Sequence, residues 1–95
     1  MVYFVATVCF DKIMEDHAYF EYIEKVVPIV KKYNGRYLVR SEKVIPLSEE
    51  WMPDRVIIIE FDTKEQLETC FASEEYRRIA QLRENSVKSN AIIVE

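Results

Sequence analysis

The feature that most constrains the fold is the segment 54–61, Asp-Arg-Val-Ile-Ile-Ile-Glu-Phe. Four β-branched aliphatic side chains stand in a row there, which is typical of a β-strand. Because side chains alternate between the two faces of a strand, this strand has no face suited to water. Residues 2–10 also carry apolar side chains on both faces. The fold must therefore cover both sides of these two strands.

The first half of the chain predicts a helix and a further strand between these two. Apolar residues recur with a helical period after Asp16, a candidate N-cap, and Pro28 is expected to kink the helix. Gly35 is expected to end the helix as a C-cap with a positive φ. Residues 36–47 include a proline and are expected to form an edge strand, with a bulge near Ser41.

The second half of the chain predicts an interrupted helix and a short strand. Asp62 with Glu65 and Thr63 with Gln66 both fit a capping box, and Ser73 is a typical N-cap. We therefore expect a helix that opens at Asp62-Thr63 and restarts at Ser73. Ser89 and Asn90 are expected to end it, before a final strand at 91–94. The order of elements is therefore βαββαβ.

This order predicts an α+β fold, the ferredoxin-like sandwich, in which helices cover one face of a four-stranded antiparallel sheet. Residues 1–95 are expected to form one such domain. The helices leave the other face of the sheet uncovered, where valine, isoleucine and phenylalanine would be exposed. A second copy laid face to face would bury them. We therefore expect a homodimer whose two sheets close into a barrel-like core.

Charge and composition exclude several classes of function. The net charge of −4 and the isoelectric point near 5.1 argue against nucleic acid as a partner. No apolar run is long enough to cross a membrane, and the first residues lack a basic signal-peptide start, so we expect a cytoplasmic protein. The single histidine and the separated Cys9 and Cys70 do not have metal-site spacing, and the single glycine leaves no phosphate-binding loop. We expect no metal and no cofactor.

Four segments together resemble the domain of unknown function 1330 family: Gly-Arg-Tyr-Leu-Val-Arg at 35–40, residues 51–61, Ser-Glu-Glu-Tyr at 73–76 and Leu-Arg at 82–83. Ser41-Glu42 replaces the family's usual glycine pair, and the region around His17 also differs. The family belongs to the dimeric α/β-barrel superfamily, so the resemblance implies a dimeric ferredoxin-like fold. Its implied functions range from cofactor-independent oxygenases, lactone isomerases and dehydratase-like enzymes to proteins without catalytic activity.

Glu60 and Arg40 are the strongest candidates for chemistry. Glu60 ends the apolar strand, and counting back from a loop centred near Glu50 places Arg40 opposite it on the neighbouring strand. A buried carboxylate beside an arginine keeps its charge, and in a pocket it can abstract a proton or anchor an anionic substrate. The alternative is a cross-strand ion pair with a structural role only.

Five other side chains are candidates, each with a structural alternative. His17 is the only side chain that ordinarily titrates near neutral pH, but a residue at a helix start is often exposed. Tyr19 and Tyr22 lie on the sheet-facing side of the first helix, where they either line a cavity or pack in the core. Trp51 is either a lid over a pocket or an anchor of the dimer interface. Arg83 either binds a carboxylate or forms a surface ion pair.

Two functional hypotheses follow. In the first, the chain is a cofactor-independent enzyme, isomerase- or monooxygenase-like. It acts on a small organic acid or ketone in a pocket between the first helix and the sheet, through Glu60, Arg40 or His17. In the second, the dimer is a non-catalytic module that binds a metabolite or another protein. An enclosed cavity of roughly a few hundred Å³ that contains two of those three side chains would favour the enzyme.

Overall fold

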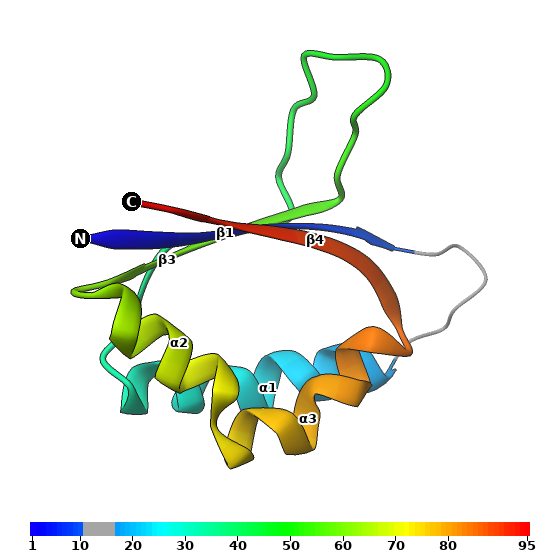
Figure 1. The fold of residues 1–95 in the computed structure, drawn as a ribbon. Coiled ribbons are helices and arrows are strands. Elements are labelled where there is room, and N and C mark those ends of the chain that lie inside the picture. The colour runs from blue at the N-terminus through cyan, green and yellow to red at the C-terminus, as the bar shows by residue number, and fades with distance from the viewer. Residues whose placement is uncertain (11–16) are drawn as a thin grey trace.

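The chain folds into two layers, with the helices on one face of a four-stranded sheet (Figure 1). The structure is a computed structural model that describes residues 1–10 and 17–95, so the proposed cap Asp16 lies outside the described residues. The elements, in chain order, are β1 (Val2–Phe10), α1 (His17–Lys32), β2 (Arg36–Ser41), β3 (Arg55–Phe61), α2 (Lys64–Ala72), α3 (Glu74–Glu84) and β4 (Val87–Val94).

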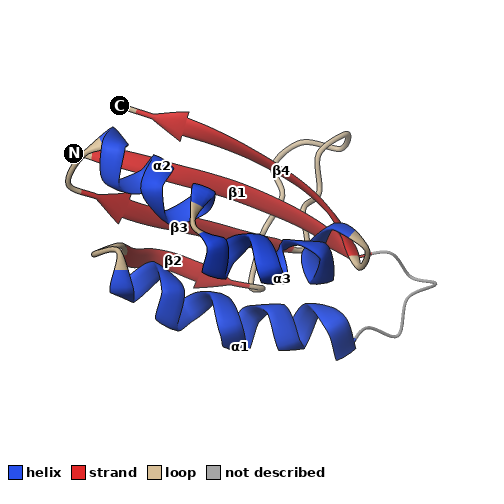
Figure 2. Cartoon of the chain, turned by 60° about the horizontal axis from the view of Figure 1, so that its bottom comes forward, coloured by secondary structure: helices blue, strands red, loops and turns tan. Residues whose placement is uncertain are grey.

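The sheet is antiparallel throughout, with strand order β2-β3-β1-β4 (Figure 2). The two strands with apolar side chains on both faces, β1 and β3, occupy its centre and pair from Val2 opposite Phe61 to Val8 opposite Arg55. This arrangement confirms the predicted α+β ferredoxin-like fold. The central positions suit these strands, because strands with apolar side chains on both faces are typical of the buried interior of a sheet.

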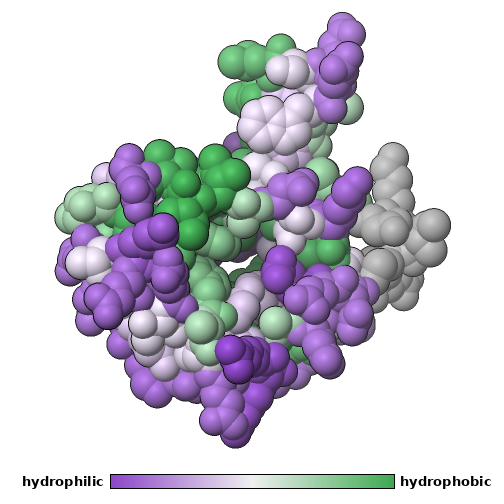
Figure 3. Space-filling model, in the orientation of Figure 1, coloured by the Kyte–Doolittle hydropathy of each residue, from purple (hydrophilic) through white to green (hydrophobic). Residues whose placement is uncertain are grey.

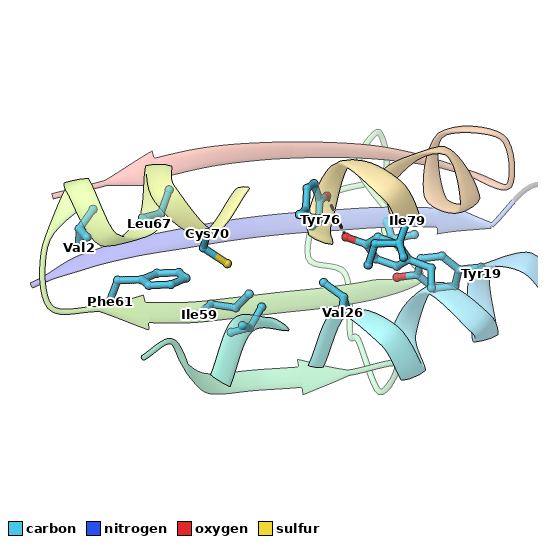
Figure 4. Packing of buried hydrophobic residues seen from close by; sticks show 12 residues of the cluster. Val2, Tyr19, Val26, Ile59, Phe61, Leu67, Cys70, Tyr76 and Ile79 are labelled. Carbon is cyan, nitrogen blue, oxygen red and sulfur yellow. Dashed lines mark hydrogen bonds between the residues drawn. The ribbon is translucent and has the colours of Figure 1, made fainter. Parts of the chain in front are cut away.

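The helices and the inner face of the sheet enclose one hydrophobic core (Figure 4). Phe61, Val30 and Cys70 have no exposed surface and lie at its centre. Full burial of a side chain the size of Phe61 stabilises the fold by about 1.5–3 kcal/mol. Of the two candidate caps of α2, Thr63 is the one used, because its Oγ1 accepts from the Gln66 amide at 3.1 Å. The predicted cap Ser73 is confirmed, because its Oγ accepts from the Tyr76 amide at 3.2 Å.

The end of α1 corrects the predicted role of Gly35. Asn34, not Gly35, adopts the positive φ, at 65°. The Gly35 amide donates to the Val30 carbonyl at 2.9 Å and the Asn34 amide to the Lys31 carbonyl at 3.1 Å, which is a Schellman motif. Glycine is required at 35 for space, because a Cβ there would lie 2.6 Å from Val30 Cγ1 and 2.9 Å from the Phe61 ring.

Strand boundaries differ from the sequence prediction at two places. β2 ends at Ser41 rather than near residue 47, because the Ser41 hydroxyl accepts from the Lys43 amide at 3.0 Å and turns the chain. Its irregularity lies between Tyr37 and Val39, not near Ser41. α3 ends at Glu84, so the predicted breakers Ser89 and Asn90 are paired residues of a longer β4.

The outer face of the sheet, away from the helices, carries an apolar row that crosses all four strands. Val39, Ile58, Val5 and Ile92 are paired across β2, β3, β1 and β4, and the last is 61% exposed. Residues 42–54 project from the sheet on this same side, with Ile45, Leu47, Trp51 and Met52 exposed (Figure 1). Figure 3 shows hydrophobic atoms along the sheet and on the projecting segment.

Substitutions at the end of α1 should change stability in opposite directions. Gly35→Ala should lower the free energy of unfolding by about 1–3 kcal/mol, because the new methyl group overpacks against Val30 and Phe61. Asn34→Gly should leave it unchanged or raise it by up to about 1 kcal/mol, because glycine adopts the left-handed conformation without strain. Urea denaturation measures both. A stable Gly35→Ala variant would contradict the steric account of this turn.

Candidate functional site

An interior cavity of about 260 Å³ lies between the inner face of the sheet and the helices. On the helix side, α1 packs mainly against α3, which lies beside it (Figure 2). Side chains from all four strands and all three helices line the cavity. Two of its lining residues, Arg40 on β2 and Ala91 on β4, are exposed, one at each edge of the sheet. Figure 3 shows the molecule hollowed between the sheet and the helix layer.

Two guanidinium groups approach one end of the cavity from opposite sides. Arg55, Val8 and Ser89 form one paired row across β3, β1 and β4. Arg83 reaches the same row from α3, because its Nη1 donates to the Ser89 hydroxyl at 2.7 Å. Arg55 is only 8% exposed, which is unusual for an arginine and requires partners for its charge.

The polar groups at this end are only partly paired. Arg55 Nη1 lies 3.6 Å from a Glu42 carboxylate oxygen, and Arg83 Nη2 lies 3.8 Å from one of Glu84. The Nε of both arginines and the Tyr19 hydroxyl are buried without a hydrogen-bond partner among the described residues. A buried donor left unpaired costs about 1–3 kcal/mol, so this end of the cavity is suited to a ligand that accepts hydrogen bonds.

Arg40 adds a third positive charge to the cavity. Its guanidinium lies over the Tyr37 ring, 5.1 Å from the centroid, and both residues line the wall on the β2 side. The described residues that line the cavity include no carboxylate. Three arginines around an apolar space therefore create a positive potential that favours an anion.

Burial raises the pKa of three tyrosines of the cavity, Tyr19, Tyr22 and Tyr37. Burial raises the pKa of Tyr19. The nearby Arg55 guanidinium partly offsets this effect, although it forms no well-formed hydrogen bond with the Tyr19 hydroxyl. Burial also raises the pKa of Tyr22, whose hydroxyl lies 3.0 Å from that of Tyr76 (Figure 4). Burial raises the pKa of Tyr37 to about 12, against the opposing effect of Arg40.

The structure brings some of the sequence-predicted residues together and separates others. Tyr19, Tyr22, Arg40 and Arg83 all line the cavity. His17 is exposed at the start of α1 and is not part of the lining.

Trp51 also lies outside the lining, on the projecting segment, where it is 61% exposed. The position of Trp51 therefore does not support a role as a lid over this cavity.

The predicted pairing of Glu60 with Arg40 is wrong. Glu60 is opposite Arg36, whose Nε donates to it at 3.0 Å, while Arg40 is opposite Ile57. The count failed because the loop between the strands, residues 42–54, is centred nearer residue 48 than Glu50, which places Arg40 opposite Ile57. Glu60 therefore lies on the outer face of the sheet, away from the cavity.

Three cavity residues, Arg55, Tyr37 and Ser89, were not predicted from the sequence. Arg55 had a signal, because alternation along the strand places it on the same face as Ile57 and Ile59. Tyr37 also had one, since alternation along its strand directs it to the inner face. Ser89 had none, because it was assigned to a helix end.

No group of three or more histidine, cysteine, aspartate or glutamate side chains is arranged to hold a metal ion among residues 1–10 and 17–95. Within the same residues, no helix is long and apolar enough to span a membrane.

Comparison with known proteins gives a family and a fold. The family model described as "Domain of unknown function (DUF1330)" matches residues 1–95, the whole chain. No curated protein matches significantly.

Three solved structures illustrate the likeness in fold. A protein of unknown function from Rhodopseudomonas palustris is 16% identical, with a TM-score of 0.81 over 98% of this chain and 79% of that chain. A protein from Arabidopsis thaliana is 15% identical, with a TM-score of 0.76 over 100% and 94%. A protein from Bacteroides fragilis, described as dimeric, of unknown function and ferredoxin-like, is 7% identical, with a TM-score of 0.60 over 99% and 94%.

The neutral tyrosines predict loss of stability in alkaline solution. A tyrosine in an unfolded chain has a pKa of about 10, whereas that of Tyr37 in the fold is about 12. Below about pH 10, Tyr37 is protonated in both the folded and the unfolded state, so its contribution to stability is fully present. Between about pH 10 and pH 12 the unfolded state loses its proton first, so the free energy of unfolding should fall as pH rises.

Urea denaturation across this pH range measures the fall, and Tyr37→Phe should make it shallower. A Tyr37→Phe variant with the wild-type pH slope would show that this hydroxyl does not contribute.

Proposed function

We propose that this chain, which belongs to the domain of unknown function 1330 family, binds a small organic acid in its interior cavity. The observation that carries the proposal is the set of three arginines around an apolar space. Arg55 and Arg83 face one end, and Arg40 lies at the β2 side. A carboxylate accepts hydrogen bonds from guanidinium groups, and such bonds are stronger than those between neutral groups.

The apolar wall supplies the rest of the recognition. Ile57, Ile59 and Val26 line the cavity together with several aromatic rings. A ligand with a carboxylate at one end and an apolar body would use both parts of the lining. Small-molecule sites commonly combine a mainly apolar wall with a few placed polar groups.

Binding without catalysis is the function that the geometry supports best. Neither Glu60 nor His17, the two bases expected from the sequence, lines the cavity, so only Arg40 of the three expected side chains is present. The second candidate is a cofactor-independent isomerase- or monooxygenase-like enzyme. It is favoured by the Tyr19 hydroxyl, which is buried beside Arg55 and stays protonated. A neutral hydroxyl so placed can donate a hydrogen bond to negative charge that develops on a substrate oxygen beside the arginines.

The functional unit in this proposal is a homodimer formed through the outer face of the sheet. The row of Val39, Ile58, Val5 and Ile92 presents apolar side chains from every strand, and a second copy would bury them. The structural neighbour from Bacteroides fragilis is described as dimeric. Trp51 projects on the same side and is proposed as an anchor of the interface, since tryptophan is enriched at interface hot spots.

Removal of one cavity arginine should weaken the binding of small carboxylates. Arg83→Gln should raise the dissociation constant about tenfold to a hundredfold, because a hydrogen bond to a charged group contributes about 1.5–3 kcal/mol. Calorimetry with a panel of aliphatic and aromatic acids measures the effect. The matched control is Arg78→Gln on the same helix, because Arg78 is exposed and pairs only with Glu74 among the described residues.

The control should bind as tightly as the wild-type protein. Equal affinities of the Arg83 variant and the wild type, or no binding of any acid by the wild type, would contradict the proposed function.

A charge on the outer face should separate the protomers. Ile92→Glu should produce a monomer at micromolar concentration, whereas the wild type should have twice the mass of one chain in native mass spectrometry. Phe20→Glu on α1 is the matched control, because Phe20 is 62% exposed and Ile92 61%.

Trp51 is the only tryptophan, so its fluorescence should shift to the blue when the wild type dimerises. A monomeric wild type, or a dimeric Ile92 variant, would overturn the proposed interface.

A further inference from the structure

We infer that the acid is a single-ring aromatic carboxylic acid, which lies on Ala6 and Ala91 with its carboxylate between Arg55 and Arg83. The inference rests on the proposed function, because it names the class of acid that the cavity holds. Three features of the lining support it: two small side chains on the floor, a chain of aromatic rings around them, and the two guanidinium groups at one end.

The floor of the cavity is recessed where two alanines stand side by side. Ala6 on β1 is paired with Ala91 on β4, and Ile57 on β3 lies on the other side of Ala6. Neighbouring strands lie about 4.8 Å apart, so two adjacent methyl groups leave a shallow and flat recess. Larger side chains bound it along β1, with Val8 at one end and Phe4 at the other. A flat ring fits such a recess more closely than a branched or flexible chain.

Aromatic rings form a continuous chain around this recess. Tyr19 stacks on Tyr22 with ring centroids 5.9 Å apart, and Tyr22 meets Tyr76 edge to face at 6.2 Å. The chain continues from Tyr76 to Phe71 at 4.9 Å and from Phe71 to Phe4 at 4.4 Å. All five rings line the cavity. Aromatic faces and edges favour another aromatic ring, so this wall selects a planar π system over an alkyl chain.

The carboxylate end is fixed by the row of Arg55, Val8 and Ser89. This row lies two residues along β1 from Ala6, or about 7 Å, so the guanidinium groups stand at one end of the recess. The unpartnered Nε groups of Arg55 and Arg83 can each donate to a carboxylate oxygen. The Tyr19 hydroxyl, which also lacks a partner among the described residues, provides a third donor at this end.

The volume of the cavity leaves room for a single-ring acid. At about 260 Å³ it is several times larger than the roughly 30 Å³ that one water molecule occupies in the liquid.

The test compares three probes on the wild-type protein by titration calorimetry: benzoate, hexanoate and benzyl alcohol. Benzoate should bind at least tenfold more tightly than either of the others, because only benzoate has both the ring and the charge. If hexanoate binds as tightly as benzoate, the inferred aromatic class is wrong while the proposed acid site stands. If neither acid binds, the proposed function itself fails, and the inference with it. If benzyl alcohol binds as tightly as benzoate, the arginines do not hold the ligand, and both the proposed function and the inferred class of acid are wrong.

A variant that fills the recess tests the position of the ring. Ala91→Leu should weaken benzoate binding at least tenfold, because the larger side chain occupies the floor beside Ala6. Ala72→Leu is the matched control, since Ala72 is exposed on α2 and does not line the cavity, and it should bind benzoate normally. Wild-type affinity in the Ala91 variant would overturn the inferred position.

Nuclear Overhauser effects on the wild-type protein provide a measurement that does not depend on a variant. Ring protons of bound benzoate should show effects to the methyl groups of Ala6 and Ala91. Effects from the ring to neither methyl group would contradict the inferred placement.

Discussion

The fold depends on one constraint, which is that its two central strands carry apolar side chains on both faces. Val5 and Ile58 point away from the helices, while Ala6 and Ile57, their neighbours along the chain, point toward them. Each strand therefore needs cover on two sides, and the three helices supply only one. The interior cavity and the apolar outer face arise from the same property, because alternate side chains of these strands line the cavity and the others form the outer face. A homodimer through the outer face would complete the cover.

The sequence predicted the fold well where local chemistry is strong. Apolar runs identified β1 and β3, and hydroxyl caps placed the starts of α2 and α3, because these signals act within a few residues. The predicted boundaries of helices and strands were wrong where a polar residue can fit two kinds of structure. Ser89 and Asn90 resemble helix breakers, yet pairing with β1 holds them in an edge strand. The left-handed residue after α1 was assigned to the glycine, whereas asparagine also adopts this conformation and the glycine is needed for packing.

The candidate site was predicted in part, since helical periodicity correctly directed Tyr19 and Tyr22 to the sheet and Arg83 also lines the cavity. The expected pair of Arg40 and Glu60 failed because cross-strand partners depend on register. The register next to the loop is set by where the long loop 42–54 is centred, and nothing local to Arg40 signals that position. The buried Arg55 was overlooked although its position in an apolar strand indicated burial.

The irregularity of β2 also affects the edge of the sheet. β2 is an edge strand, and a regular edge presents unpaired backbone groups on which another chain can form a further strand. Around Leu38 the regular ladder is interrupted, and the flanking Arg36 and Arg40 are charged. An incoming strand therefore meets an edge with broken spacing and two like charges. Broken spacing and charged residues disfavour the addition of a further strand at the β2 edge of the sheet.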